Sequence, residues 1–357
     1  MKNVCICLRI HQPLRLKRYR FFQMGYDHFY LDDNQNRREM QRAVVSNYTP
    51  AIKLIERLVE TRGSKFAISI SISGAALEQL REYSPLMIDQ LCHLAQFRQI
   101  EWIAETHHHT LSSLFDYKEF QTQVDNYRQL LDEILSVKAT TFRNTDLIYT
   151  PTIGRWVSQM GFTAMLVGGV QSDTLHFNSK HPKTKLLSYS TWQNFDSLNR
   201  WINRSQGDLF CTTIFGEDIN NSNVAEFEDA INRLMNNEEV ALSVPREIVG
   251  RLKAEHILKI ASEGGLSDWA QNELQREAIN QIYNLRDRVK SLNNVNLTNA
   301  WRLLQSVDNF RPMSLDLTDS NPYGTPYEAF INYMNVLGDF NQVLNSKSTV
   351  LSLSEKK

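Results

Sequence analysis

Titratable side chains follow segments of this chain that are predicted to be β-strands. His11 comes directly after the apolar run Val4 to Ile10, and Glu105 and His109 follow the run Ile100 to Ala104. Carboxylate and imidazole groups donate and accept protons, and both hydrogen-bond to hydroxyl groups. Because the C-terminal ends of the strands in a β/α barrel meet on one face, these side chains are expected to line one cleft.

Two later segments add a carboxylate, an arginine and a thiol to the predicted cleft. Arg143 and Asp146 follow one predicted strand, and Cys211 and Glu217 lie at the end of another. Arg143 either charges the pocket or forms a structural salt bridge. A thiol is a weak hydrogen-bond donor with an ordinary pKa of about 8.5, so Cys211 is either a poor proton donor or a small buried apolar side chain.

The run His107-His108-His109 permits two interpretations. In one interpretation, these histidines and His11 form a zinc site, because imidazole is a common zinc ligand. Neighbouring side chains of a strand point to opposite faces, so only His107 and His109 would share a side. We expect hydrogen-bonded pocket histidines instead, with no metal and no cofactor.

The segments that must position these side chains alternate between two patterns. Short runs rich in β-branched residues are separated by stretches whose apolar residues recur every three or four positions, such as 51–58 and 124–134. This alternation predicts βα units and a parallel sheet. Seven runs are predicted strands: Val4 to Ile10, Phe66 to Ile72, Ile100 to Ala104, Thr140 to Phe142, Thr163 to Val167, Asp208 to Phe215 and Val240 to Val244.

The pattern changes near Leu266, where the predicted strands stop. Amphipathic stretches then cover roughly 268–292, 298–305 and 326–344, which predicts a helical subdomain. The pair Gly264-Gly265 marks the boundary, because adjacent glycines interrupt regular structure. The predicted organisation is a barrel over residues 1–265, a helical subdomain over 266–345 and a polar tail over 346–357.

Bulk properties exclude several classes of protein. The 357 residues include 39 basic and 40 acidic side chains, a balance that favours neither nucleic acid nor an anionic membrane surface. The four cysteines lack metal-type spacing and are expected to be reduced thiols. The first apolar segment is too short for a signal peptide, and no run approaches the length of about 18 residues that a membrane helix needs. We therefore expect a cytoplasmic protein without nucleic acid or membrane partners.

Five segments follow one another along the chain: His11-Gln12-Pro13, Glu105 to Leu111, Phe142 to Tyr149, Leu209 to Glu217 and Leu304 to Phe310. In this order they resemble the motifs of glycoside hydrolase family 57. The family carries Glu at the position of Asp146 and a catalytic Asp at the position of Cys211. Asp218 stands where the family usually has His.

The resemblance implies an incomplete seven-stranded (β/α) barrel followed by a C-terminal helical bundle. It also implies retaining chemistry on an α-glucan or maltooligosaccharide, in which two carboxyl groups about 5 Å apart act as nucleophile and acid/base. Asp146 occupies the nucleophile position and Cys211 the acid/base position. Substrate contacts are implied for seven further residues: His11, Glu105, His109, Arg143, Glu217, Asp218 and Asp308.

The altered pair predicts an α-amylase-like protein that binds a glucan and is weakly active or inactive. Asp146 is one methylene shorter than Glu, and a displacement of about 1 Å costs about 100-fold in rate. Loss of acid–base assistance costs about 100- to 10,000-fold. The alternative is an active hydrolase or glucanotransferase that uses Asp218 or Glu217 as a substitute acid.

Overall fold

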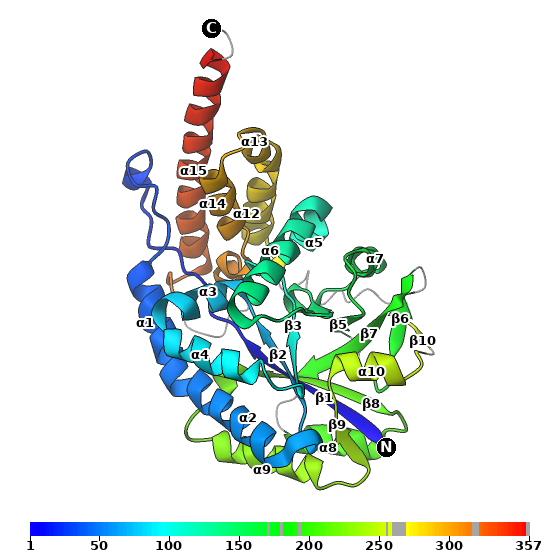
Figure 1. Ribbon diagram of the computed structural model, residues 1–357. Coiled ribbons are helices and arrows are strands. Elements are labelled where there is room, and N and C mark those ends of the chain that lie inside the picture. Colours follow the sequence, from blue (N-terminus) through cyan, green and yellow to red (C-terminus); the bar gives the residue numbers. More distant parts are fainter. Residues whose placement is uncertain are drawn as a thin grey trace. The chain divides into compact units, whose positions relative to one another are not determined.

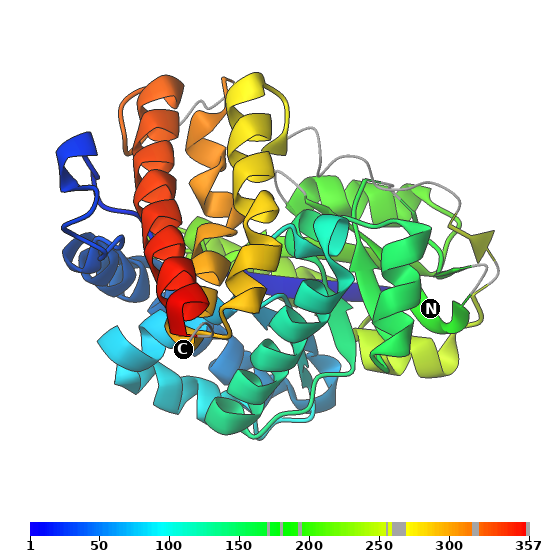
Figure 2. The ribbon, with the colours of Figure 1, turned by 90° about the horizontal axis from the view of Figure 1, so that it is seen from above.

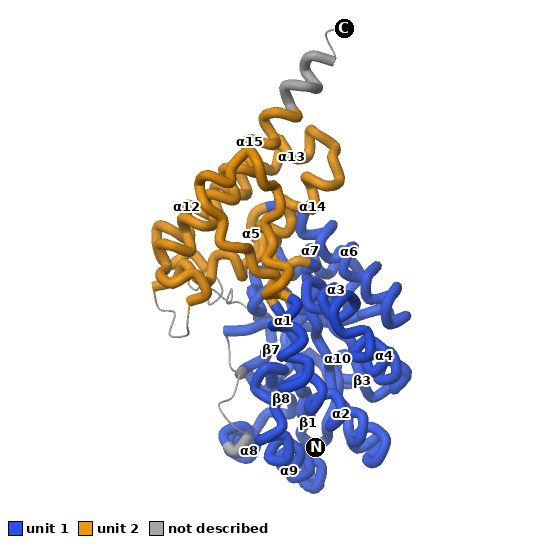
Figure 3. Tube along the Cα trace, turned by 90° about the vertical axis from the view of Figure 1, so that its left-hand side faces the viewer, with its two compact units in different colours: residues 1–12, 37–107, 116–265 blue, residues 13–36, 108–115, 266–357 orange. Residues whose placement is uncertain are grey.

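The chain forms two compact units. The computed structural model describes residues 1–169, 172–178, 181–191, 195–254, 256–258, 269–315 and 321–354. Figure 3 colours unit 1 (residues 1–12, 37–107 and 116–265) blue and unit 2 (residues 13–36, 108–115 and 266–357) orange. Unit 1 contains the sheet, and unit 2 is helical.

Parallel strands of unit 1 pair into a ring (Figure 1). β1 pairs with β2 and β8, β2 with β3, β4 with β5, β5 with β7, and β7 with β8. A bridge between Ala104 and Phe142 joins the end of β3 to β4. The strands of the ring are β1 (Lys2–Ile10), β2 (Ile68–Ile72), β3 (Ile100–Ile103), β4 (Thr141–Arg143), β5 (Ala164–Val167), β7 (His181–Thr191) and β8 (Leu209–Phe215).

One strand of this ring was not predicted. The run Val240 to Val244 was expected to belong to the seven, but among the described residues β9 (Val240–Leu242) pairs with the beginning of β1 alone. The ring instead contains β7, whose first half is polar because it forms an antiparallel hairpin with β6 (His176–Asn178). β6 also pairs with the short β10 (His256–Ile257).

Helices of unit 1 connect the strands and present apolar stripes to them. The stripe of α6 consists of Phe120, Val124, Tyr127 and Leu131, all buried, which confirms the period expected from the sequence. Helix starts carry ordinary capping groups, as where Ser73 Oγ accepts the N–H of Ala76 at 3.2 Å. The helices are α2 (Thr49–Arg62), α3 (Gly74–Tyr83), α4 (Pro85–Leu94), α6 (Tyr117–Leu135), α7 (Pro151–Gln159), α8 (Phe195–Arg204), α9 (Val224–Met235) and α10 (Pro245–Arg251), while α1 (Asp33–Ala43) spans residues of both units.

Unit 2 is a group of helices together with two segments from earlier in the chain. Figure 2 shows α12 and α15 running side by side. The buried carboxylate of Asp339 in α15 accepts hydrogen bonds from Gly25 N and from the hydroxyl of Tyr30, each at 2.7 Å, which explains why residues 13–36 group with these helices. The helices are α5 (Ser112–Phe115), α12 (Glu273–Asn284), α13 (Arg286–Ser291), α14 (Val295–Leu304) and α15 (Pro326–Ser354).

The observed division of the chain differs from the predicted one in two respects. Residues 13–36 and 108–115, which were assigned to the barrel, group with the helical unit. The tail predicted for 346–357 is helical as far as Ser354, because α15 continues through it. The predicted Gly264-Gly265 boundary lies outside the described residues. In the part of the chain that is described, no helix combines the length and hydropathy needed to cross a bilayer.

Glu101 of β3 links the sheet to helix α10. Its carboxylate, 2% exposed, accepts the backbone N–H of Arg246 at 2.8 Å and the hydroxyl of Thr141 at 2.5 Å. Burial raises the pKa of Glu101 above its usual 4.5, because it disfavours the charged form more than these two hydrogen bonds favour it.

Replacing Glu101 with Gln is expected to change how folding stability depends on pH. A carboxyl group with a raised pKa in the folded chain binds its proton more tightly than in the unfolded chain, so stability falls as the pH rises from the unfolded value to the folded one. Melting temperatures measured from pH 4 to 7 should show wild type losing stability relative to Glu101→Gln over that range. The exposed Glu82→Gln variant is the control. Parallel curves for wild type and Glu101→Gln would contradict the prediction.

Candidate functional site

The side chains inside the ring are apolar toward the N-terminal ends of the strands and polar toward the C-terminal ends. Every second side chain of a strand points inward, and on β1 these are Cys5, Cys7 and Arg9. The two cysteines belong to a buried apolar cluster that includes Leu166 and Leu187. Arg9 lies nearer the C-terminal end, where polar side chains replace the apolar ones.

Arg9, Glu105 and Arg143 form a buried ionic network at this end. The Glu105 Oε1 atom lies 3.8 Å from Arg9 Nε and 3.9 Å from Arg143 Nη1, and the Ser71 hydroxyl donates to the same oxygen. Arg9 is 6% exposed, Glu105 1% and Arg143 3%. Burial, followed by repulsion from Arg9, lowers the pKa of Arg143 to about 10 despite the attraction of Glu105 and Asp146. One carboxylate therefore lies between two guanidinium groups.

Asp146 follows β4 on a tightly constrained turn. Its φ and ψ are 47° and 30°, and Leu147 also has a positive φ of 59°. Such left-handed geometry is unfavourable for residues with a side chain and persists only where the surroundings impose it. Asn144 Nδ2 donates to Ile148 O at 2.9 Å, and Gly168 N donates to Leu147 O at 3.1 Å. The turn holds the half-buried Asp146 just after the C-terminal end of β4.

Cys211 is not at the end of its strand. It is the third residue of β8 and pairs in register with Cys5 of β1 and Tyr189 of β7. Its side chain is 1% exposed and belongs to the apolar cluster. At about 3.3 Å per residue, it lies about 13 Å along the strand from Phe215, where β8 ends. The sequence predicted the strand that contains Cys211 but not how far Cys211 lies from the C-terminal end of that strand.

His11 and the residues after β8 occupy the C-terminal side of unit 1. His11 Nδ1 lies 2.7 Å from Ser73 Oγ, and Tyr48 OH donates to His11 O at 3.1 Å. Asn47 Nδ2 donates to the carbonyl of Glu217 at 2.8 Å, and the charge of Glu217 adds to burial in raising the pKa of Tyr48. The short 3₁₀ turn Gly216–Asp218 exposes both of its carboxylate side chains.

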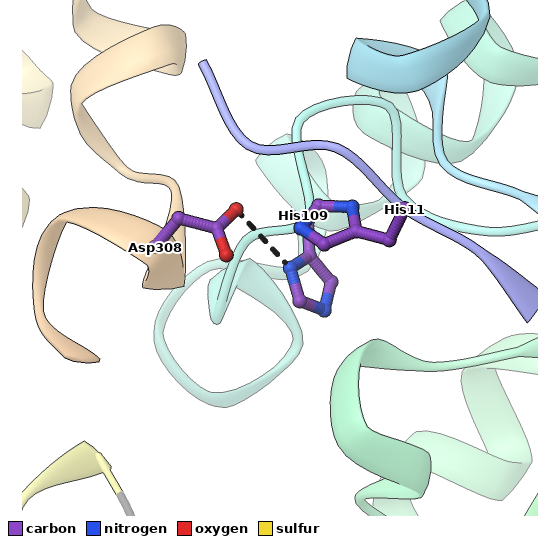
Figure 4. Close-up of side chains that lie close together, drawn as sticks. All are labelled: His11, His109 and Asp308. Atoms are coloured by element: carbon purple, nitrogen blue, oxygen red, sulfur yellow. Dashed lines mark hydrogen bonds and ion pairs between the residues drawn. The ribbon is translucent and has the colours of Figure 1, made fainter. Parts of the chain in front are cut away.

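The histidine run is a turn rather than a strand, so the expected alternation of faces does not apply to it. In unit 1, His107 Nε2 lies 3.3 Å from Glu78 Oε1. In unit 2, His109 has a positive φ of 53° and its Nδ1 lies 3.4 Å from Asp308 Oδ2, the contact drawn as a dashed line in Figure 4. Asp308 also accepts a hydrogen bond from Ser306 Oγ at 2.9 Å. The sequence named both His109 and Asp308 but not their pairing.

One cluster on the outer helices of unit 1 has the composition of a cation site. The Nε2 atom of His93 on α4 lies 3.5 Å from Glu56 Oε1 and 3.6 Å from Glu60 Oε1, both on α2. Glu60 is 53% exposed and His93 43%. Ordinary surface ion pairs account for this arrangement.

Sequence reasoning missed four residues of the ring interior. Arg9, Ser71, Tyr189 and Thr213 are buried and polar, and all lie on strands of the ring. Arg9 could have been identified from the sequence, because it is a charged residue in the otherwise apolar run Val4 to Ile10. Tyr189 was missed because its strand was missed.

A ring of parallel strands with polar side chains at the C-terminal end is the arrangement of a β/α-barrel enzyme. The sequence profile of glycosyl hydrolase family 57 matches residues 5–195, more than half of the chain. The chain therefore belongs to glycosyl hydrolase family 57. It is an α-amylase-like member of this family, which acts in carbohydrate metabolism.

Other proteins are similar to this chain in sequence or in fold. A putative α-amylase of Methanocaldococcus jannaschii is 25% identical over 387 residues, covering 93% of this chain and 82% of the relative. A family 57 branching enzyme from Thermococcus kodakaraensis has a similar fold, with a TM-score of 0.72 at 12% identity over 96% of this chain and 90% of that one. A 4-α-glucanotransferase from Thermococcus litoralis gives a TM-score of 0.65 at 12% identity, covering 94% of this chain and 59% of that one. The present chain thus spans less than two thirds of the glucanotransferase.

Proposed function

We propose that unit 1 binds an α-glucan or maltooligosaccharide at the C-terminal ends of its strands and hydrolyses it slowly or not at all. Membership of family 57 supports the substrate class. The observation that carries the low activity is the position of Cys211, a buried thiol among apolar side chains at the acid/base position. A thiol there is a poor source of the proton that a leaving glycosidic oxygen needs.

The nucleophile position supports the same conclusion. Asp146 keeps a carboxylate, but its side chain is shorter than the Glu of the family, and its rigid turn restricts compensating movement. Retaining hydrolysis needs the two carboxyl groups about 5 Å apart, with one of them attacking the anomeric carbon. In this proposal the barrel is the incomplete seven-stranded form of the family, and His11, Glu105 and Arg143 contact the sugar.

Binding without turnover is the expected result when the purified chain is titrated calorimetrically with maltotriose and maltoheptaose. A parallel hydrolysis assay should show a rate about 100-fold or more below that of a family member with an intact Glu and Asp pair. Asp146→Ala should leave this rate nearly unchanged. Robust turnover that Asp146→Ala abolishes would contradict the proposal, as would the absence of binding.

A second function has one observation in its favour. Partial desolvation raises the pKa of Asp218, an exposed residue of the turn after β8. A carboxyl group with a raised pKa is suited to donate a proton near neutral pH. If the chain is an active hydrolase or glucanotransferase, Asp218→Asn should abolish its turnover, and Glu217→Gln tests the neighbouring carboxylate in the same way.

A further inference from the structure

Residues 15–32 of unit 2 form a closed loop beside α15, which we call the aromatic loop (Figure 1). Its two ends pair with each other, since Lys17 N donates to Tyr30 O at 2.8 Å. Nearer its tip, the hydroxyl of the buried Tyr19 donates to Asp27 O at 2.5 Å. The loop therefore has a defined conformation.

Side chains of α15 hold the aromatic loop in place. Asn332 Oδ1 accepts the backbone N–H of Tyr19 at 2.6 Å, and Asn335 Nδ2 donates to Tyr19 O at 3.1 Å. One turn further along the helix, the buried carboxylate of Asp339 accepts the N–H of Gly25 at 2.7 Å. A segment fixed at several points keeps its outward side chains in position, and such side chains lose little freedom when they bind a partner.

The outward side chains of the aromatic loop are apolar. Four of them are mostly exposed: Phe21 is 67% exposed, Phe22 87%, Tyr26 90% and Phe29 83%. An aromatic side chain buries roughly 150–250 Å² when it is covered, so the four offer about 500–800 Å² of surface. The largest apolar patch of a typical monomeric protein is about 300–600 Å², and larger patches mark interaction sites.

Two residues of α15 extend this apolar surface. Tyr327 is 62% exposed and Ile331 39%. They precede Asn335 at intervals of four residues, which puts them on the stripe of α15 that leads to the loop. The exposed aromatic side chains are thus continued by the helix that holds them.

We propose that the aromatic loop is the interface of a homodimer, in which two copies of this chain pack their loops together about a twofold axis. Such an interface uses the same patch on both copies. The four aromatic side chains of each copy would then bury about 1,000–1,600 Å² in total, which reaches the range of about 1,200–2,000 Å² for stable interfaces. This inference does not depend on the proposed sugar-binding function.

The composition of the loop also favours a second copy of the chain as the partner. Arg20 is exposed and directly precedes Phe21 and Phe22. An arginine lies favourably over the face of an aromatic ring. A patch that carries both groups is complementary to a copy of itself, because the arginine of one copy meets a ring of the other.

Two other partners suit this surface less well. A sugar ring stacks on a flat aromatic surface, but the rings of Phe21 and Phe22 lie at 82° to each other, with centroids 5.9 Å apart. An anionic membrane attracts clusters of basic residues, whereas Lys17 in the loop is paired with Asp27 at 2.5 Å. The 39 basic and 40 acidic residues of the chain add no general attraction to such a membrane.

Analytical ultracentrifugation of the full chain, at concentrations from about 1 to 100 µM, tests the interface. We expect a species with about twice the chain mass of 41.5 kDa to predominate in the upper part of this range. A monomer at every concentration would overturn the inference.

Substitutions in the loop test where the two copies meet. Phe22→Ser and Phe29→Ser should each raise the dissociation constant of the dimer about tenfold or more, because aromatic anchors dominate interface energies. Arg20→Ala should raise it by a smaller factor, and Phe22→Tyr, which keeps the ring, should leave the dimer intact. Val295→Ser on α14, where Val295 is 72% exposed, is the matched control and should change nothing. A dimer that both serine variants leave unchanged would overturn the inference.

The melting temperature of the diluted, monomeric chain shows whether the variants fold. Both serine variants should match wild type under these conditions, because substitutions of exposed side chains change stability by no more than about 0.5 kcal/mol. If Phe22→Ser does not fold, the comparison of Phe29→Ser with Phe22→Tyr decides, since equal dimerisation by these two would overturn the inference.

Two binding measurements distinguish the second copy from other partners of the loop. The affinity of Phe22→Ser for maltoheptaose should equal that of wild type, and a loss of this affinity without a loss of dimer would overturn the inference in favour of a sugar-binding surface. Monomeric chain that floats with vesicles of phosphatidylcholine and phosphatidylglycerol would overturn it in favour of a membrane. A dimer that depends on Phe22 and Phe29 would support the inference even if the chain bound no glucan.

Discussion

The double variant Asp146→Glu/Cys211→Asp is expected to hydrolyse maltooligosaccharides about 100- to 10,000-fold faster than the wild-type chain. Glu at position 146 restores the reach of the nucleophile. Asp at position 211, which belongs to the same buried cluster as Leu147 beside position 146, supplies a proton donor. The two carboxyl groups act as one unit in retaining hydrolysis, so each single variant should gain far less than the pair.

The surroundings of Cys211 suit a carboxylic acid that must stay protonated. Its side chain is 1% exposed among apolar groups, and burial raises the pKa of a carboxyl group. The hydroxyl of Tyr189, its register partner on β7, is buried and has no hydrogen-bond partner in the described residues, so it can donate to an Asp at this position. The substitution should still cost about 1–3 kcal/mol of stability, as expected for a new buried polar group.

Initial rates on maltoheptaose, measured for wild type, both single variants and the double variant, check this prediction. Asp146→Glu/Cys211→Asn is the matched control, because Asn has the shape of Asp but cannot donate an acidic proton. A folded double variant that binds maltoheptaose and is no faster than this control would show that the altered pair is not what limits activity.

Glu105→Gln is expected to lower the free energy of unfolding by about 3–5 kcal/mol. The substitution removes the one carboxylate within ion-pair distance of both Arg9 and Arg143 in the described structure, leaving two buried guanidinium groups to repel each other. Removing one member of a buried ionic network costs more stability than replacing the whole network with apolar side chains, because the remaining charges stay desolvated.

Urea denaturation of a mutant series checks the origin of this loss. Arg9→Met added to Glu105→Gln should recover part of the lost stability, because it removes one of the two buried like charges. Glu82→Gln on the exposed face of α3 is the control and should stay within about 0.5 kcal/mol of wild type. A loss below about 1 kcal/mol for Glu105→Gln would contradict the buried network.

The sequence by itself determined the class of fold. Alternating β-branched runs and helical periods identified six strands of the ring, because those strands are buried along most of their length and contain few polar residues. β7 was missed because its first half lies in a hairpin with β6, where the exposed Lys183 and the half-buried Lys185 interrupt the apolar pattern. The motifs also predicted that Glu105 and Asp146 come after strands, and in unit 1 they follow β3 and β4, whereas Arg143, expected after its strand, is the last residue of β4.

Only the tertiary structure decided the depth and the partners of these side chains. Register between β1, β7 and β8 puts Cys211 beside Cys5 and Tyr189, and no local pattern encodes a pairing between residues so distant in sequence. The joining of Arg9 and Arg143 through Glu105 likewise depends on three separate strands coming together. Periodicity fixes which side of a strand a residue faces, whereas the closure of the ring fixes what it meets there, and that closure is a property of the whole chain.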